Sequence, residues 1–191
     1  MTGTRPIIKV AAIDIIELGK SRRVDCIVNP ANRELAEGGA LCGEIYNAAA
    51  SNHLDDDLRG VLGISEGSAL ITKGHSLCPL IIHTLAPRVE DESKWTKHRD
   101  CYVHVLNLAD WAFSQHGLKS IAIPALGTGV HGLPANQADL TAADIVVNSG
   151  FGGEIILCFA PDYDGTERAE RIREHLIESN GYTEDEVALT A

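Results

Sequence analysis

The sequence predicts an α/β protein, a three-layer α/β/α sandwich with a central mixed, mostly parallel sheet. Two observations lead to this prediction. Short apolar segments alternate along the chain with segments of helical periodicity, and most of the short segments are apolar on both faces. Strands of that kind belong to sheets that helices cover on both sides. The 191 residues, 45% of them hydrophobic, suit one domain with a substantial core.

Six of the short apolar segments have the composition of strands. They are rich in β-branched side chains and are bounded by turn residues, as strands in a covered sheet usually are. We expect the third and fourth to pair around the turn at residues 73–79. The six predicted strands are residues 7–13, 24–28, 67–72, 80–85, 120–126 and 154–160.

Helices are predicted between most of these strands. The clearest covers residues 102–113, where apolar side chains recur near the 3.6-residue period. Pro134 fits the first position of another, because proline lacks the N–H that a first helical residue leaves unpaired. Gly181 suits the end of the last helix, and the polar residues 90–97 are expected to form a loop. The other predicted helices begin near residue 44 and cover residues 54–62, 134–148 and 166–179.

The chain is expected to form a single domain over residues 1–181, followed by a flexible C-terminal tail at residues 182–191. No linker, repeat or low-complexity segment divides the chain. Neither a signal pattern nor an apolar run of membrane-spanning length is present, so we expect no association with membranes. We expect a monomer.

Charge and cysteine usage narrow the functional classes. The formal net charge is −11, which disfavours general binding to nucleic acid, because that binding rests on Lys and Arg contacts to phosphates. The five cysteines are scattered and odd in number, which indicates reduced thiols in a cytoplasmic protein. The eight histidines form no zinc-binding motif, and neither a P-loop nor a G-x-S-x-G motif is present, so we expect no metal and no cofactor.

Two glycine-rich loops indicate an anion site. Residues 38–43 and 127–132 each follow a predicted strand and precede a predicted helix. Glycines let a ligand approach the backbone closely, and unpaired N–H groups at a helix start attract phosphates. Residues 127–132 formally match G-x-G-x-x-G, but the acidic residue that a dinucleotide-binding fold needs about 20 residues later is missing. Turn formation alone is the alternative to phosphate binding.

Three polar side chains near the first loop are candidates for contacts with a ligand. Asn29 and Asn32 lie where a strand ends; an amide suits a ribose diol, although both asparagines could equally shape the turn. Cys42 lies at a helix start, which can lower the pKa of a thiol. No His or Asp stands at a recognisable offset from it, which favours a packing role over a nucleophile.

Taken together, five segments in order resemble the macro domain family, the ADP-ribose-binding module. The chain has counterparts of the segment after the first strand, the V-D-A-I-V-N-A-A-N signature, the first diphosphate loop, the I-H-x-V-G-P strand and the second loop, written I-A-F-P-x-x-x-T-G-x-x-G-x-P. These counterparts are residues 13–15, 24–32, 38–45, 82–87 and 121–134.

The resemblance implies a cleft for ADP-ribose. Asp14 would hold the adenine amino group with Ile15 beside it, and Phe159 would lie against the adenine, although Phe159 fits the hydrophobic core equally well. Asn32 would bind the distal ribose and is the catalytic candidate, and His131 stands where the family often has Phe or Tyr. The implied ligand-binding positions are Asp14, Ile15, Asn32, Gly38, Gly39, Ala40, Leu41, Cys42, Gly43, Pro87, Gly127, Thr128, Gly129, Val130, His131 and Phe159.

One departure from the family pattern leaves the function open between two alternatives. Hydrolases of the MacroD type carry a G-G-V-D-G aspartate, and Cys42 stands at that position here. A neutral thiol is a poor general base. The chain is therefore expected either to hydrolyse ADP-ribosyl linkages in mono-ADP-ribosylated protein or O-acetyl-ADP-ribose by a water-mediated, substrate-assisted route, or to read ADP-ribose without catalysis. Either way its partner is ADP-ribose or an ADP-ribosylated macromolecule. Glu37, beside the first loop, adds a negative charge near the expected diphosphate.

Overall fold

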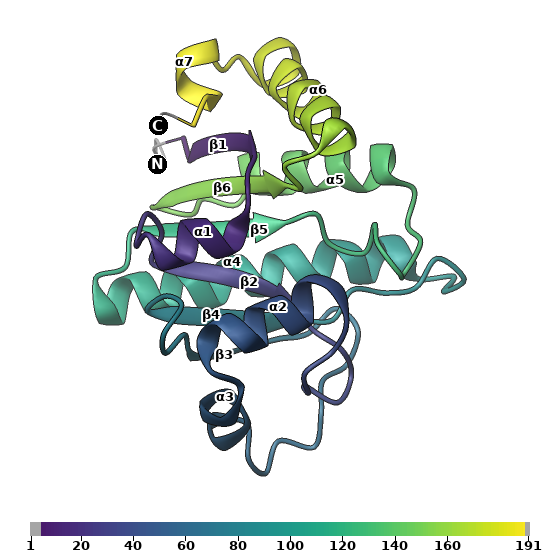
Figure 1. The fold of residues 1–191 in the computed structure, drawn as a ribbon. Coiled ribbons are helices and arrows are strands. Elements are labelled where there is room, and N and C mark those ends of the chain that lie inside the picture. The colour runs from purple at the N-terminus through teal and green to yellow at the C-terminus, as the bar shows by residue number, and fades with distance from the viewer. Residues whose placement is uncertain (1–4, 190–191) are drawn as a thin grey trace.

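The computed structural model describes residues 5–189, which form a six-stranded sheet with helices on both faces (Figure 1). The strand order is β1-β6-β5-β2-β4-β3, and every neighbouring pair is parallel except β3 and β4. This confirms the predicted fold class and the pairing of the third and fourth strands. The strands are β1 (Ile7–Ala12), β2 (Cys26–Pro30), β3 (Ala69–Lys73), β4 (Leu80–Thr84), β5 (Ser120–Pro124) and β6 (Glu154–Phe159).

Three helices cover each face of the sheet, and a seventh short helix lies beside the edge strand β1 (Figure 1). The helices α1 (Ile15–Lys20), α2 (Ala40–Ala49) and α3 (Ser51–Asp57) cover one face. The helices α4 (Lys94–His116), α5 (Ala135–Val147) and α6 (Tyr163–Asn180) cover the other, and α7 is Glu184–Val187. Among residues 5–189, no helix combines the length and the apolar character that a membrane crossing requires.

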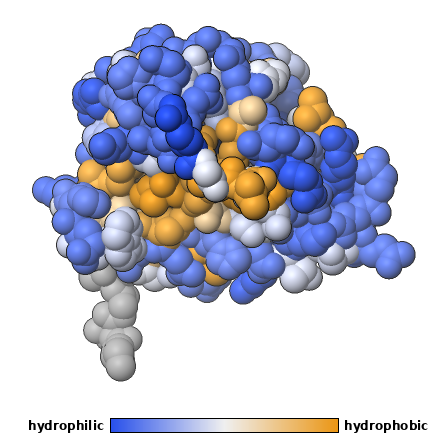
Figure 2. Space-filling model, turned by 90° about the horizontal axis from the view of Figure 1, so that it is seen from below, coloured by the Kyte–Doolittle hydropathy of each residue, from blue (hydrophilic) through white to orange (hydrophobic). Residues whose placement is uncertain are grey.

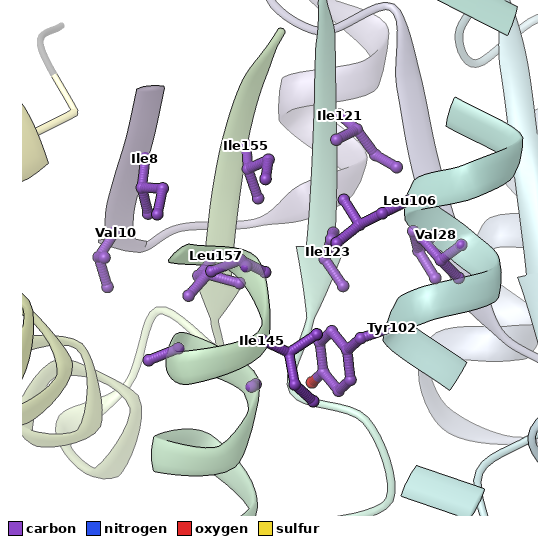
Figure 3. Close-up of a cluster of buried hydrophobic side chains, with 14 of the residues drawn as sticks. Ile8, Val10, Val28, Tyr102, Leu106, Ile121, Ile123, Ile145, Ile155 and Leu157 are labelled. Atoms are coloured by element: carbon purple, nitrogen blue, oxygen red, sulfur yellow. The ribbon is translucent and has the colours of Figure 1, made fainter. Parts of the chain in front are cut away.

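The two faces of the sheet bury separate hydrophobic clusters, because side chains alternate along each strand. In β6, Ile155 and Leu157 face α4, α5 and α6, whereas Ile156 and Cys158 face α1, α2 and α3. Figure 3 shows the first of these clusters, in which strand side chains meet Tyr102 of α4. Burial on both faces explains why the central strands read as continuous apolar runs.

Several helices differ from their predicted extents: α2 begins at Ala40 and not near residue 44, α3 covers Ser51–Asp57 and not residues 54–62, and α4 begins earlier than expected. Lys94 begins α4 inside the segment expected to be a loop; Lys97 forms ion pairs with Glu66 and Asp91, so polar side chains are satisfied on the outer side of this first turn. Helix α1 was not predicted. It is one and a half turns long, and Asp14 caps it by accepting a hydrogen bond of 2.8 Å from the N–H of Ile16.

The edge of the sheet at β3 is open along one side. Figure 2 views the molecule from the side of α3 and β3 and shows apolar side chains gathered in a band that polar side chains surround. On β3, Ala69, Leu70 and Ile71 are half-buried, and Lys73 is exposed at the end of the strand. A lysine at an edge strand is a common protection against pairing with other chains.

The expectation of a flexible tail from residue 182 is wrong for the described part of that segment. Tyr182 and Val187 are buried, and the hydroxyl of Tyr182 donates a hydrogen bond of 3.0 Å to the carbonyl of Pro6. Thr183 and Glu186 form a capping box at α7, and Ala188 bridges to Val10 of β1. The segment is polar in sequence because only one side of it packs on the domain. Residues 190 and 191 lie outside the described residues.

We expect Val187→Ala to lower the free energy of unfolding by about 2 kcal/mol, because it removes two fully buried methyl groups and leaves a cavity. The measurement is urea unfolding at pH 7. Val61→Ala makes the same change at a position that is 43% exposed and should shift stability by less than about 0.5 kcal/mol. Equal effects of the two substitutions would show that α7 does not contribute to the core.

Candidate ligand-binding cleft

A cleft opens where β2 and β5 separate. These neighbouring strands pair only at their beginning, through Cys26 with Ile121 and Ile27 with Ala122. Their outer neighbours stay paired to the end, since β2 pairs with β4 up to Pro30 and β5 with β6 up to Pro124. Each of the two separating strands ends in a proline, which has no N–H to give to a ladder. The separation therefore occurs at one place in the sheet.

The connections after β2 and β5 leave for opposite faces of the sheet. The loop after β2 leads to α2, and the loop after β5 leads to α5 on the other side. A crevice at the carboxyl ends of parallel strands, where the direction of the connections changes, is the usual ligand site in an open α/β sheet. Both glycine-rich loops of the sequence lie at this crevice.

Two cavities that share residues occupy the cleft. The larger, of about 420 Å³, lies toward β1 and β6, and the smaller, of about 190 Å³, lies toward β4. Ala40, Leu41, Ala125 and Gly129 line both cavities. Ala40, Leu41 and Gly129 belong to the two glycine-rich loops, and Ala125 lies two residues before the second loop. The loops therefore form the narrow region between the two cavities, which we call the waist.

The first loop presents a helix N-terminus to the cleft. Gly39 is the residue before α2, and no side chain caps the helix, so the N–H groups of Ala40, Leu41 and Cys42 have no acceptor within the helix. Ala40 has a φ of +48°, a conformation that costs a residue with a side chain about 1 kcal/mol. Strain of this kind concentrates where the backbone serves a ligand.

Internal hydrogen bonds hold the first loop in place. The side chain of Asn32 forms two hydrogen bonds with the backbone of Ala36. It donates one of 2.8 Å to the carbonyl and accepts one of 3.1 Å from the N–H. The hydroxyl of Tyr46 donates a hydrogen bond of 2.5 Å to the carbonyl of Leu35. Glu37 is exposed and accepts a hydrogen bond from Asn47, so its charge lies away from the cavities, which do not include it among their lining residues.

The second loop depends on a positive φ at Gly127. Its φ is +78°, and a Cβ there would approach Leu133 to 2.6 Å. The carbonyl of Gly127 accepts from the N–H of Leu133 at 3.0 Å, which closes the loop. The backbone of Gly129 faces open space, since a Cβ added there meets no atom within 4 Å. The loop is therefore tight at its base and accessible at its tip.

Arg168 fastens the second loop to α5 and α6. Its guanidinium donates two hydrogen bonds of 2.8 Å to the buried carboxylate of Asp139 and one of 3.1 Å to the hydroxyl of Thr128. It also lies 5.1 Å above the ring of Phe159. The carboxylate partner raises the pKa of Arg168, so the cation is fixed in this position. Arg168 lines the larger cavity.

The larger cavity has an acceptor, an aromatic ring and a cation around it. Asp14 is exposed at its rim and uses one carboxylate oxygen to cap α1. Ile15 and Phe159 are buried in its wall, and Glu44 of α2 also lines it. A planar heterocycle with an amino group could lie against this apolar wall and donate to the second oxygen of Asp14.

The smaller cavity is backed by a buried chain of polar groups. Nδ2 of Asn29 lies 3.0 Å from Nδ1 of His83 and 3.7 Å from the sulfur of Cys42. Nε2 of His83 lies 2.9 Å from the hydroxyl of Thr72. Because Asn29 donates to Nδ1, the proton of the ring stands on Nε2 and is donated to Thr72, whose hydroxyl donates to the carbonyl of Lys73.

Burial keeps the groups of this chain uncharged. It lowers the pKa of His83 to about 4 and raises the pKa of the Cys42 thiol above its ordinary value. The sulfur of Cys42 also donates a long hydrogen bond, 3.8 Å, to the carbonyl of Ala36. Cys42 is therefore a neutral thiol that packs behind the first loop, which agrees with a packing role and not with an activated nucleophile.

Known proteins share both the sequence pattern and this fold. A family model described as Macro domain matches residues 28–142, well over half of the chain. The chain belongs to the macro domain family. This confirms the resemblance drawn from the sequence motifs.

Among curated relatives, an uncharacterised protein of Fusobacterium nucleatum is 35% identical over 134 residues, which are 69% of this chain and 72% of that protein. The mouse ADP-ribose glycohydrolase MACROD1 is 37% identical over 130 residues, 66% of this chain. The match spans 38% of the length of the mouse enzyme. The relationship therefore concerns the macro domain and leaves most of that enzyme without a counterpart in the matched segment.

Two solved structures show the same fold. The Oceanobacillus iheyensis macrodomain with ADP superimposes with a TM-score of 0.81 at 24% identity, covering 94% of this chain and 96% of the other. The Trypanosoma brucei macrodomain in complex with ADP-ribose has a TM-score of 0.70 at 25% identity, with coverages of 86% and 68%. The order of strands and helices in the macro domain is thus independent of close sequence similarity.

The structure brings most of the predicted site residues of this macro domain to the cleft. The larger cavity includes Asp14, Ile15, Ala40, Leu41, Thr128, Gly129 and Phe159. The smaller cavity includes Gly39, Ala40, Leu41, Cys42, Gly127, Gly129, Val130 and His131.

Four predicted site residues of the macro domain do not line either cavity. Asn32 lies beside them with its amide engaged by Ala36. Gly38 is behind the loop, where a Cβ would approach the amide of Asn32 to 2.9 Å, and Gly43 packs against the carbonyl of Gly38. Pro87 is buried, and its neighbour Ala86 lines the smaller cavity instead. Contact of Asn32 with a ligand stays a prediction. It would use the second N–H or the second oxygen lone pair of the amide, which the bonds to Ala36 leave free.

Arg168 and Glu44 line the larger cavity but are not recognisable as site residues from the sequence alone. Arg168 lies in a polar helix where it looks like any exposed arginine, and its partner Asp139 lies 29 positions earlier. A buried aspartate inside an otherwise apolar helix face was the one available signal. Among residues 5–189, no three His, Cys, Asp or Glu side chains are placed to hold a metal ion.

We expect Arg168→Ala to lower the free energy of unfolding by about 3 kcal/mol, since it leaves the carboxylate of Asp139 buried without its main partner. The measurement is urea unfolding. Arg171→Ala, on the same helix, removes a longer contact of 3.5 Å from a side chain that is 36% exposed, and should cost less than about 1 kcal/mol. If Arg168→Ala lowered the free energy of unfolding no more than Arg171→Ala does, the pair of Arg168 and Asp139 would not stabilise the fold as described.

The pH dependence of stability should report the neutral state of His83. Its pKa is about 4 when folded and about 6.5 when unfolded, so the unfolded state binds more protons between these values. The stabilisation is complete above pH 6.5 and is lost as the pH falls toward 4. We expect His83→Gln to reduce the loss of stability between pH 7 and pH 4.5 by about 2 kcal/mol. A pH profile of unfolding that is the same in His83→Gln and in the wild type would show that burial does not keep the ring of His83 neutral.

Proposed function

We propose that the cleft binds ADP-ribose, with the adenosine in the larger cavity, the diphosphate at the waist and the distal ribose in the smaller cavity. One observation carries this proposal: uncapped backbone amides of the first loop and the open tip of the second loop meet between two cavities. A molecule with a nucleoside at one end, two phosphates in the middle and a sugar at the other end fits this order.

The orientation follows from the side chains of the two cavities. Asp14 and Phe159 give the larger cavity an acceptor and an aromatic wall, which suit adenine. The smaller cavity has no aromatic residue besides His131 and lies beside the amide of Asn32, which suits a sugar. The relatives support the same ligand, since one solved macrodomain is a complex with ADP-ribose.

Backbone amides explain how a chain with a net charge of −11 can hold a diphosphate. The N–H groups of Ala40, Leu41 and Cys42 and the positive end of α2 attract anions without a basic side chain. Glu37 does not oppose them, because it points away. Recognition in this site therefore depends on loop geometry, and a general attraction to nucleic acid does not follow from it.

The activity that we propose is hydrolysis of ADP-ribosyl linkages in mono-ADP-ribosylated protein or O-acetyl-ADP-ribose. The mouse relative MACROD1, an ADP-ribose glycohydrolase, supports this activity. A non-catalytic reader is the second candidate, and the observation that favours it is Cys42, a neutral thiol where MacroD-type hydrolases carry a carboxylate. Release of ADP-ribose from a mono-ADP-ribosylated protein distinguishes the two candidates.

The setting that we propose is a monomer in the cytoplasm that acts on ADP-ribosylated macromolecules. Five unpaired cysteines, all buried, support a reducing compartment. The high negative charge supports a monomer, since it opposes self-association.

Calorimetry with ADP-ribose, AMP and NAD tests the binding proposal. We expect ADP-ribose to bind more tightly than AMP, because AMP lacks the second phosphate and the distal ribose that would occupy the waist and the smaller cavity. Absence of measurable heat with ADP-ribose would overturn the proposal.

We expect Gly129→Val to weaken ADP-ribose binding at least tenfold while the fold is kept. The added side chain points into open space at the waist, where it occupies the place of the diphosphate, and a tenfold loss is about 1.4 kcal/mol. Gly152→Val is the matched control, since a Cβ there also meets no atom within 4 Å but lies in the loop before β6. Wild-type affinity in the Gly129 variant would show that the ligand does not pass the waist.

A further inference from the structure

We propose that His131 is the general base of this macro domain, with Nε2 of its ring taking the proton from the attacking water. The inference rests on the proposed hydrolysis and replaces a substrate-assisted step by a group of the protein. It is carried by the hydrogen bond that orients the ring, by the place of the ring in the smaller cavity, and by the absence of another suitable group among the residues that line this cavity.

A backbone carbonyl fixes the tautomer of His131. Nδ1 lies 2.7 Å from the carbonyl oxygen of Ala86. A carbonyl can only accept, so Nδ1 carries the proton and donates it. In the neutral ring the basic lone pair is then on Nε2, at the opposite edge. A hydrogen bond on one ring nitrogen that sets the state of the other is how proteins usually prepare a catalytic or ligating histidine.

The main chain around His131 limits its movement. The carbonyl of His131 accepts a hydrogen bond of 2.9 Å from the N–H of Val89, and the N–H of Gly132 bonds to the carbonyl of Gly129. Ala86 itself follows β4, whose pairing with β2 continues to its last residue. Both the main chain and the ring of His131 are thus hydrogen-bonded to the segment that follows β4, through Val89 and Ala86.

The smaller cavity offers no better base. Its lining is Pro30, Ala31, Gly39, Ala40, Leu41, Cys42, Ala86, Ala125, Gly127, Gly129, Val130 and His131. Only Cys42 and His131 can exchange protons there. Burial raises the pKa of Cys42, so the thiol holds its proton at neutral pH. No carboxylate lines the cavity, although Glu37 is close along the chain, because that side chain turns to Asn47.

The buried histidine nearby cannot serve instead. Both ring nitrogens of His83 are engaged, by Asn29 and Thr72, and the residue is fully buried. Nε2 of His131, in contrast, has no hydrogen-bond partner in residues 5–189, and the ring is half-buried. Two histidines thus lie behind and beside the same cavity, and only His131 presents an unused nitrogen.

The step balances for an acyl-linked ADP-ribosyl group. A water oxygen forms a bond to C1″ of the distal ribose, and the bond from C1″ to the carboxyl oxygen of the modified side chain breaks. Its electron pair leaves with the carboxylate, which needs no acid to depart. Nε2 of His131 takes one proton from the water and returns it to solvent, leaving ADP-ribose and the free carboxylate.

The test compares His131→Phe with the wild-type protein on a protein that carries ADP-ribose on glutamate side chains. Phenylalanine keeps a ring in the cavity but has no basic nitrogen. We expect the rate of ADP-ribose release to fall at least a hundredfold, the scale at which a general base contributes, while calorimetry gives an ADP-ribose affinity within about threefold of wild type. His116→Phe, at an exposed site of α4, should keep the wild-type rate.

A second variant separates proton transfer from packing. His131→Ala should regain part of its rate when imidazole is added, because free imidazole supplies the missing base, whereas equal concentrations of sodium chloride should not restore it. Retention of the wild-type rate in His131→Phe would overturn the inference and leave a substrate phosphate as the base. Tight ADP-ribose binding without any turnover by the wild type would also overturn it and favour the reader, whereas absence of binding would overturn the proposed function itself.

Discussion

The separation of β2 from β5 is the constraint on which the site depends. Five strands run parallel, so their carboxyl ends all lie at one edge of the sheet, but only this pair stops pairing early. Pro30 and Pro124 end the two strands without an N–H to donate. The loops that follow leave for opposite faces, and the space between them becomes the cleft. If β2 and β5 paired along their whole length, the two glycine-rich loops would have no cleft between them.

Side-chain hydrogen bonds hold both loops in place without using the amides at the start of α2. Asn32 and Tyr46 fix the first loop through carbonyl and N–H groups of residues 35 and 36. Arg168 fixes the second through Thr128, with the buried Asp139 as its counter-ion. These contacts leave the amides at the start of α2 without an internal partner. Amides that are held in place before the ligand arrives lose little freedom on binding, and this lowers the cost of association.

The distal end of the cleft combines a buried polar chain with one accessible histidine. Asn29, His83 and Thr72 form a hydrogen-bonded chain behind the cavity, and burial keeps His83 and Cys42 uncharged. The cavity therefore has a neutral wall. In such a wall a single imidazole, oriented by the carbonyl of Ala86, dominates the proton chemistry. A position usually filled by an aromatic ring in this family thereby acquires a group that can exchange a proton.

The sequence by itself determined the layers, the six strands and the two glycine-rich loops, because alternation of apolar segments and glycine placement are local signals. It did not reveal the short α1, which has too few residues for a period, or the packing of residues 182–189, in which Tyr182 and Val187 are buried with four exposed polar residues between them. It also gave no sign of the pair formed by Arg168 and Asp139 or of the carbonyl that orients His131. Those contacts join residues that are 29 and 45 positions apart. In the unfolded chain each of these polar groups forms equally good hydrogen bonds with water. Only the tertiary fold therefore decides which distant polar groups meet.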